Sequence, residues 1–432
     1  MRRCHSPSGR PRHARHRCDA APWWHQDACD HRQTMTSQRE PTAALAAASL
    51  FSDGPRTERG PKGHAESEYA FLNDSARGAC ARARELLDTW YGQLPPEAQA
   101  SIRSRFKLAD VAQHRGAVWE LYLHETFRRL EYAIELDIGK ENPEKLHPDF
   151  LLTGVGDFYL EATAALGASV LGDSAANKLA AACRDLIEEV NAPNFSIGVD
   201  LEACGPGSAP RREVIDPLER WLDPLDPDEV LAAQAAGEEL PTITLSFAGW
   251  NIVCTAIPVG PNHRDDPGHR VLGTYSEGFS VIDDAKPLRR KLKRKAGRYG
   301  EMELPYVIAV LCAGDFADDK DIADALFGSV SLRFDIRTGR ATPVREPDAL
   351  WIGPKGPQNT RVSAVLTIPQ LSWSAIAAVE PTVWLNPWAA RPLTAELPWR
   401  TKAIAPDGSM GTREPRVTPA ALFEISPRWP SE

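Results

Sequence analysis

Three acidic residues are the first candidates for chemistry in this chain. Glu120, Asp149 and Glu161 all fall within residues 117–164. Carboxylate oxygens are the preferred ligands of Mg²⁺ and Mn²⁺, and no histidine or cysteine spacing in this stretch suggests zinc. If the local structure brings the three side chains together, they form a candidate site for one or two such ions.

Two strands are expected to carry Asp149 and Glu161. Residues 157–163 alternate between apolar and polar side chains, which places Glu161 and Thr163 on the same face of a strand. Asp149 begins an apolar run that glycines 154 and 156 end, and this pattern predicts a short strand, a turn and a second strand. The two carboxylates are therefore expected side by side.

Glu120 lies on a helix expected over residues 108–130. Counted at about 100° per residue, Trp119, Leu123 and Phe127 form an apolar stripe, and Glu120 falls only about 20° beyond Phe127. A carboxylate so close to the core needs a partner. Two interpretations stay open: an edge residue that reaches water or forms an ion pair with an arginine, or a metal ligand shared with Asp149 and Glu161.

Pro148-Asp149, a hairpin and then Glu161-Ala162-Thr163 resemble the PD-(D/E)XK nuclease superfamily, whose mark is Pro-Asp, a hairpin, an acidic residue, any residue and lysine. The resemblance implies an α/β (α+β) fold that is restriction-endonuclease-like. Its mixed central sheet is flanked by helices, in the core order helix, three strands, helix, strand. It also implies that Asp149, Glu161 and Glu120 bind Mg²⁺ or Mn²⁺ and catalyse hydrolysis of phosphodiester bonds in DNA.

Thr163 stands where the family has lysine, and this departure keeps other functions open. One alternative is a catalytically inactive nuclease-fold protein that binds nucleic acid or a protein partner. Another is an unrelated α/β protein whose acidic residues are incidental. An active enzyme needs a cation from another element, because threonine has no charge to stabilise the transition state.

A helix expected over residues 283–299 offers that cation. Leu288, Leu292 and Ala296 form its apolar stripe, and Lys295 falls about 20° from Leu288 on the core side. A lysine there either pairs with a structural carboxylate or takes the role of the missing motif lysine. Other cations are candidates as well, namely Lys178 as a second replacement lysine and Lys291, Arg294 and Arg298 as contacts to nucleic-acid phosphates.

Composition limits the classes of function. The chain has 432 residues, 25% of them charged and 42% hydrophobic, and a net charge of −9. This charge argues against a protein that coats nucleic acid nonspecifically, so any contact with DNA must be local. No apolar run reaches the roughly 18 residues of a membrane span, and no Cys-x-x-Cys pair occurs. We therefore expect a cytoplasmic protein without a membrane partner.

Three regions are expected along the chain. Residues 1–65, rich in Arg, His, Pro and then Ala, predict a disordered tail, in which Met35 is an alternative start. Residues 66–400 predict a single nuclease-like α/β domain that is β-rich after residue 328, with a surface insertion at about 204–240. Within it, the helix over residues 177–190 and the strand over 195–201 follow the hairpin as the next core elements. Residues 401–432 predict an irregular tail.

Overall fold

A computed structural model describes residues 49–136, 147–166, 175–264, 269–273, 285–313, 318–335, 337–405 and 409–431. The chain divides into two compact units, residues 1–47 and 48–432. Every element described below belongs to the second unit, and residues 1–48 of the expected tail lie outside the described residues. Within the described ranges, none of the helices combines the length and the apolar character that crossing a membrane requires.

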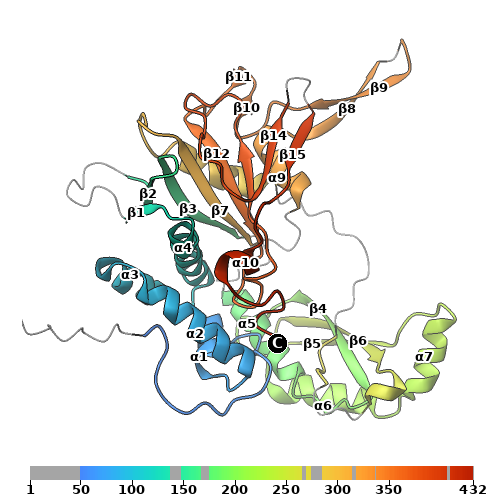
Figure 1. The fold of residues 1–432 in the computed structure, drawn as a ribbon. Coiled ribbons are helices and arrows are strands. Elements are labelled where there is room, and N and C mark those ends of the chain that lie inside the picture. Colours follow the sequence, from blue (N-terminus) through green and yellow to red (C-terminus); the bar gives the residue numbers. More distant parts are fainter. Residues whose placement is uncertain are drawn as a thin grey trace, which may run out of the picture. The chain divides into compact units, whose positions relative to one another are not determined.

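Four helices open the fold (Figure 1): α1 (Glu68–Asp74), α2 (Gly78–Gly92), α3 (Pro96–Phe106) and α4 (Val111–Arg129). α1 and α2 are separated at Ser75, whose backbone is extended, and the Ala76 N–H donates to the Glu58 carbonyl at 2.6 Å. α3 was not expected, although Pro96 at its first position is favourable for starting a helix.

The central sheet has eight strands in the order β1-β2-β3-β7-β12-β13-β14-β15. β1 to β3 form an antiparallel meander, β7 is parallel to both β3 and β12, and the remaining pairs alternate in direction. The expected class, a mixed α/β fold with a large mixed sheet flanked by helices, is confirmed. Its strands are β1 (Ala133–Leu136), β2 (Phe150–Thr153), β3 (Phe158–Leu166), β7 (Tyr306–Ala313), β12 (Val362–Pro369), β13 (Thr382–Leu385), β14 (Arg400–Ile404) and β15 (Met410–Arg413).

Helices cover both faces of this sheet. On one face, α4 packs Trp119 and Phe127 against Phe158 and Leu160 of β3. On the other face, α8 (Ala285–Ala296) and α9 (Asp319–Phe327) pack against the β7 side chains on that side of the sheet. β7 is buried on both sides, and this explains its unbroken apolar sequence, which is typical of a central parallel strand.

The elements that follow β3 form a separate three-stranded sheet in the order β4-β6-β5, with its own apolar core. The helix and strand expected over residues 177–190 and 195–201 both exist, but their expected place in the core was wrong: β7, and not β4, pairs with β3. A short alternating strand does not specify which sheet it joins. The elements here are α5 (Ala175–Ile187), β4 (Phe195–Ala203), α6 (Arg211–Leu222), α7 (Pro227–Ala235), β5 (Thr242–Phe247), β6 (Trp250–Pro258) and η1 (Pro261–His263).

Both expected tails reach into the fold. Leu50 and Phe51 are buried in the core of the main sheet, so the tail expected to extend to residue 65 was wrong for residues 49–65. Residues 401–432 are not irregular: they contribute most of β14, all of β15 and α10 (Pro419–Phe423). Phe423 packs on Trp90, with ring centroids 4.8 Å apart. Apolar anchors of this kind, isolated in sequence, have no periodicity to reveal them.

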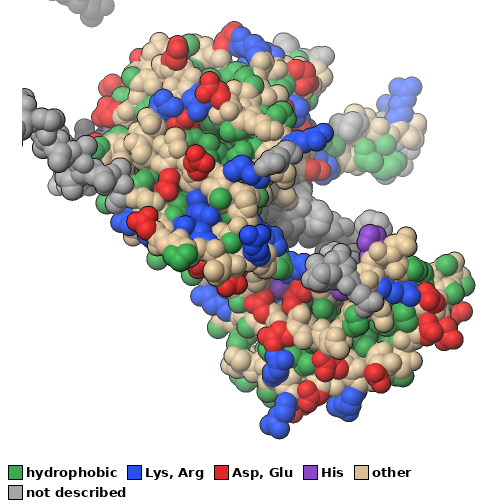
Figure 2. Space-filling view, turned by 60° about the horizontal axis from the view of Figure 1, so that its bottom comes forward, with side chains coloured by type: hydrophobic (Ala, Val, Ile, Leu, Met, Phe, Trp, Pro, Cys, Tyr) green, Lys and Arg blue, Asp and Glu red, His purple; other side chains and the backbone are tan. Residues whose placement is uncertain are grey.

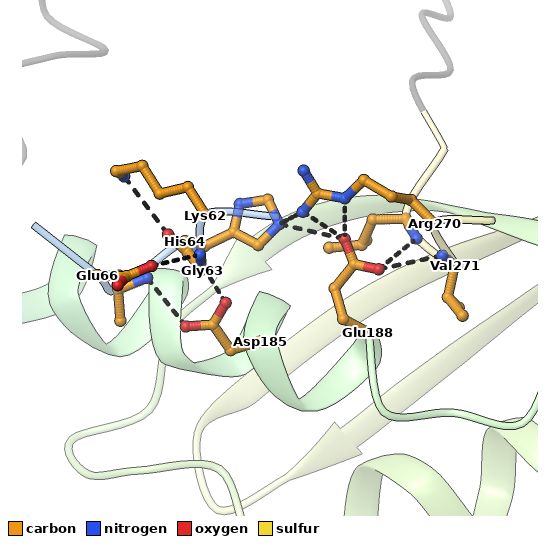
Figure 3. Close-up of polar contacts among 10 residues, drawn as sticks. Lys62, Gly63, His64, Glu66, Asp185, Glu188, Arg270 and Val271 are labelled. Atoms are coloured by element: carbon orange, nitrogen blue, oxygen red, sulfur yellow. Dashed lines mark hydrogen bonds and ion pairs between the residues drawn. The ribbon is translucent and has the colours of Figure 1, made fainter. Parts of the chain in front are cut away.

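The segment around His64 is fixed to the region of α5 by two carboxylates (Figure 3). Asp185 accepts the backbone N–H groups of His64 and Ala65 at 2.6 and 2.9 Å. Glu188 accepts the Val271 N–H at 3.0 Å and pairs with Arg270 at 2.6 Å. We call Glu188, Arg270 and Val271 the Glu188 cluster.

Short strands complete the fold: β8 (Val330–Asp335) and β9 (Arg340–Arg345) form a hairpin, and β10 (Ile352–Gly353) pairs with β11 (Gly356–Pro357). On the face seen in Figure 2, acidic and basic side chains are interspersed over most of the surface. This mixture agrees with a chain of modest net charge in which any contact with a polyanion is local.

Candidate functional site

The β2–β3 hairpin brings Asp149 and Glu161 together. Asp149 directly precedes β2, where Phe150 pairs with Leu160, the residue before Glu161. The Ala162 N–H donates to Asp149 Oδ2 at 2.8 Å. The two carboxylates therefore lie side by side as expected, with Asp149 one residue before the start of its strand.

Glu161 is fully buried, at 0% exposure, and is surrounded by donors from the last turn of α8 and from the turn that follows it. Its carboxylate accepts from Lys295 Nζ and the Tyr299 hydroxyl in close contacts, and from Arg298 Nη1 at 3.1 Å. The neighbouring β3 residues Leu160 and Ala162 point to the opposite face, as the alternation predicted. We call Glu161 and its three donors the Glu161 cluster.

The expected phase of α8 is confirmed. Leu288, Leu292 and Ala296 are buried against the sheet, whereas Lys293 is exposed. Lys295 reaches Glu161, two residues before the threonine that replaces the motif lysine. Thr163 itself is buried in β3 and pairs with Val310 in the ladder.

Electrostatic repulsion is concentrated at Asp149. Burial raises the pKa of Asp149 to about 7, and the negative charges of Glu161 and Glu120 act in the same direction. Lys295 and the Ala162 N–H oppose this shift. Burial and the hydrogen bond to Glu161 likewise raise the pKa of Tyr299, so its hydroxyl stays protonated and donates. Asp149 and Glu161 thus share a region of low dielectric, and Glu120 adds a third negative charge nearby.

Glu120 pairs with an arginine. Arg105, on α3, donates to both of its carboxylate oxygens at 2.6 Å. Of the two interpretations open from the sequence, the ion pair is therefore present in this structure. Both side chains are about one quarter exposed, and Glu120 also lies close enough to raise the pKa of Asp149.

A small pocket joins Glu120 to Asp149. Arg105, His124, Phe150 and apolar residues of α3 also line it, and its interior of about 40 Å³ has room for water. His124 is buried, its Nδ1 has no hydrogen-bond partner within the described ranges, and burial lowers its pKa. His124 was not among the residues expected from the sequence, although its spacing of four residues from Glu120 places both on one helix face.

The donor set is chemically suited to Mg²⁺ or Mn²⁺. Among the described residues, no three His, Cys, Asp or Glu side chains are already grouped to hold a metal ion. Asp149 nevertheless lies near two other carboxylates, and a divalent cation would remove the repulsion between them. Arg105 and Lys295 currently neutralise two of the three acids.

The other expected cations differ in their surroundings. Lys291 is half-buried, and burial followed by the charges of Arg294 and Lys295 lowers its pKa. Arg294 is exposed on α8, and Arg298 is exposed while contacting Glu161. Lys178 is exposed on α5, whose buried side chains belong to the core of the three-stranded sheet. It is Lys295 that α8 presents to Glu161.

Comparison with known proteins found no matching family model, no matching curated protein and no matching solved structure.

Proposed function

We propose that the chain is a metal-dependent nuclease of the PD-(D/E)XK type that hydrolyses phosphodiester bonds in DNA. The observation that carries this proposal is the contact between Lys295 and Glu161 beside Asp149. A lysine from α8 thereby occupies the neighbourhood that the family's motif lysine would fill from position 163. Lys295, on another element, therefore supplies the positive charge that Thr163 lacks.

The order of elements supports the same proposal. When the three-stranded sheet and its helices are set aside as an insertion between β3 and α8, the order is α4, β1, β2, β3, α8, β7. This is the order of helix, three strands, helix and strand that the resemblance implies. The insertion separates β3 from β7 in sequence, and this explains why the local pattern pointed to β4.

Asp149 and Glu161, joined by Glu120, would hold Mg²⁺ or Mn²⁺ in the proposed enzyme. When bound, the ion supplies a water of lowered pKa and offsets negative charge on the scissile phosphate. Lys295 is placed to donate to the phosphate oxygens as negative charge develops. Lys291, Arg294 and Arg298 would contact neighbouring phosphates and fix the position of the strand without reading its bases.

A second candidate function is a catalytically inactive protein of the same fold that binds nucleic acid or a protein partner. One observation favours it: Arg105 and Lys295 already neutralise Glu120 and Glu161. With cations beside two of its three carboxylates, the site has less negative charge for a metal ion to offset.

Cleavage assays separate the two functions. We expect the purified chain to nick plasmid or single-stranded DNA with Mg²⁺ or Mn²⁺ but not with a chelator. Lys295→Ala should lower the rate by roughly 10², the scale for one preorganised electrostatic contact. Lys293→Ala, on the exposed face of the same helix, is the matched control and should cut normally. Binding without metal-dependent cleavage on any substrate would favour the inactive protein.

A further inference from the structure

The β8–β9 hairpin carries an uncovered apolar face. Val330, Leu332 and Phe334 are 49%, 63% and 67% exposed, and they alternate along β8, so they share one face. Ala341 on β9 pairs with Phe334 and extends this face. Figure 1 shows the hairpin extending away from the other strands, and Figure 2 shows apolar side chains on it with basic side chains at its end.

The base of the hairpin is firmly attached to the fold. Arg345 donates to the Gly328 carbonyl at 2.7 Å and pairs with the buried Asp324 of α9 at 3.5 Å. Gly328 has a φ of 105°, and a Cβ there would lie 2.0 Å from the Glu346 carbonyl oxygen. Only glycine fits this position. The apolar face is therefore held out by a defined anchor, and exposed apolar surface of this kind marks an interaction site.

The charge of the hairpin identifies its partner. Residues 329–346 contain four arginines, at positions 333, 337, 340 and 345, against Asp335 and Glu346, whereas the whole chain carries −9. Arg345 pairs with Asp324 at the base, so the excess positive charge of the arm comes from the other three. A local excess of arginine on an acidic protein favours a polyanion. By the same alternation, Arg333 points to the face opposite Leu332 and Phe334, and Arg340, which pairs with Asp335 in the ladder, lies on that opposite face too. A narrow two-stranded ribbon of this kind suits a single strand, because bases pack on its apolar face and phosphates at its edge pair with the arginines behind it.

We propose that the β8–β9 hairpin is an arm that binds single-stranded DNA. Leu332 and Phe334 pack against unpaired bases, and Arg333 contacts the phosphates. The choice of DNA rests on the proposed nuclease function, whereas the arm itself is argued from its exposure and charge. A single strand is favoured over a duplex because a flat apolar face needs bases that are free to stack.

Binding without cleavage tests the arm directly. Fluorescence anisotropy of a labelled oligodeoxythymidine is measured in EDTA with the full chain. We expect the Leu332→Ala, Phe334→Ala double variant to weaken the Kd by roughly 10-fold or more, and Phe334→Trp to retain wild-type affinity. Val155→Ala is the control, because Val155 is 62% exposed on the turn between β2 and β3. All these residues are at the surface, so the variants should fold.

Salt dependence tests the arginine. Arg333→Ala should reduce the slope of log Kd against log salt by about 0.7, the value for one phosphate contact on a single strand. If Arg333→Ala leaves the slope unchanged and the double variant leaves the affinity unchanged, the proposal that the hairpin binds DNA is wrong. Tighter binding to the matching duplex than to the single strand would overturn the choice of unpaired DNA.

Two outcomes separate the arm from the nuclease. If the chain cuts DNA and the arm variants bind it normally, the arm is wrong and the nuclease stands. If the arm variants lose binding and the wild type cuts nothing, the nuclease is wrong and the arm stands. Sedimentation tests a second copy of this chain as the partner. If wild type is a dimer and the double variant is a monomer with unchanged affinity for DNA, the hairpin is a contact between two copies of the chain and the arm is wrong.

Discussion

The Glu161 and Glu188 clusters each hold a carboxylate with arginine, yet they are built differently. Glu188 is 20% exposed, and it accepts backbone N–H groups of Val271 and Leu272 at 3.0 and 3.3 Å (Figure 3). Glu161 is 0% exposed, and all its described donors are side chains of α8 or of the turn that follows it. Backbone donors tie segments of chain together, whereas side-chain donors are able to exchange partners by changing rotamer.

Their neighbours differ as well. Around Glu188 the partners are cations and N–H groups, which is what a structural carboxylate needs. Glu161 has Asp149 beside it, and burial with two acidic neighbours raises the pKa of Asp149 to about 7. Packing like charges together costs stability, and such arrangements concentrate at functional sites. The comparison therefore supports a structural role for Glu188 and agrees with the role in chemistry proposed for Glu161.

Substitution of Glu161 should give the largest effect. Glu161→Gln removes the negative charge between Lys295 and Arg298 and leaves a largely buried ammonium without its anion. We expect the free energy of unfolding to fall by about 3–5 kcal/mol, the range for breaking a buried ion pair, as measured by urea denaturation. A loss below about 1 kcal/mol would mean that the ion pairs of Glu161 contribute no more to stability than an exposed surface pair does.

Asp149→Asn should increase the free energy of unfolding in the absence of metal, opposite to the effect of Glu161→Gln. The raised pKa means that the folded state keeps a proton that the unfolded chain releases near pH 4, so wild-type stability falls between about pH 4 and pH 7. Asparagine removes this penalty and keeps the acceptor for the Ala162 N–H. We expect the variant to be more stable than wild type at pH 7 by about 1–2 kcal/mol, because partial exposure reduces the full effect.

The pH series supplies the check on that prediction. Denaturation without divalent ions should show the gap between variant and wild type shrinking as pH falls from 7 to 4. A gap that is constant with pH would show that the Asp149 carboxyl does not titrate in this range. Adding Mn²⁺ or Ca²⁺ should raise the melting temperature of wild type and leave that of Asp149→Asn unchanged.

Local patterns predicted most of this site. Strand alternation placed Asp149 beside Glu161, and helical phase placed Lys295 on the buried side of α8. The choice of β7 as the partner of β3 depends on contacts across a long insertion, and no local period encodes it. The partner of Glu120 was missed because α3 was missed, although Ala98, Ile102 and Phe106 repeat at a spacing of four.

Arg105→Ala should have a smaller effect on stability and a measurable effect on metal binding. The Arg105–Glu120 pair is partly exposed, so its loss should cost about 0.5–1 kcal/mol. Release of Glu120 should strengthen Mn²⁺ binding severalfold, because a carboxylate beside Asp149 becomes available. Isothermal titration calorimetry measures this directly. Unchanged or weaker Mn²⁺ binding would remove Glu120 from the proposed ligands and leave it as a structural ion pair.

Glu188→Gln should have the smallest effect and is the sharpest control for the comparison. Glutamine keeps an oxygen that accepts the backbone N–H groups of Val271 and Leu272, and it loses only the charge opposite Arg270. Because that pair is partly exposed, we expect a loss below about 1 kcal/mol. The Mn²⁺ response and the cleavage rate should match wild type, since no donor of the Glu161 cluster is touched. If Glu188→Gln abolished either one, backbone donors would no longer distinguish a structural carboxylate from a functional one, and Glu188 would have to join the site.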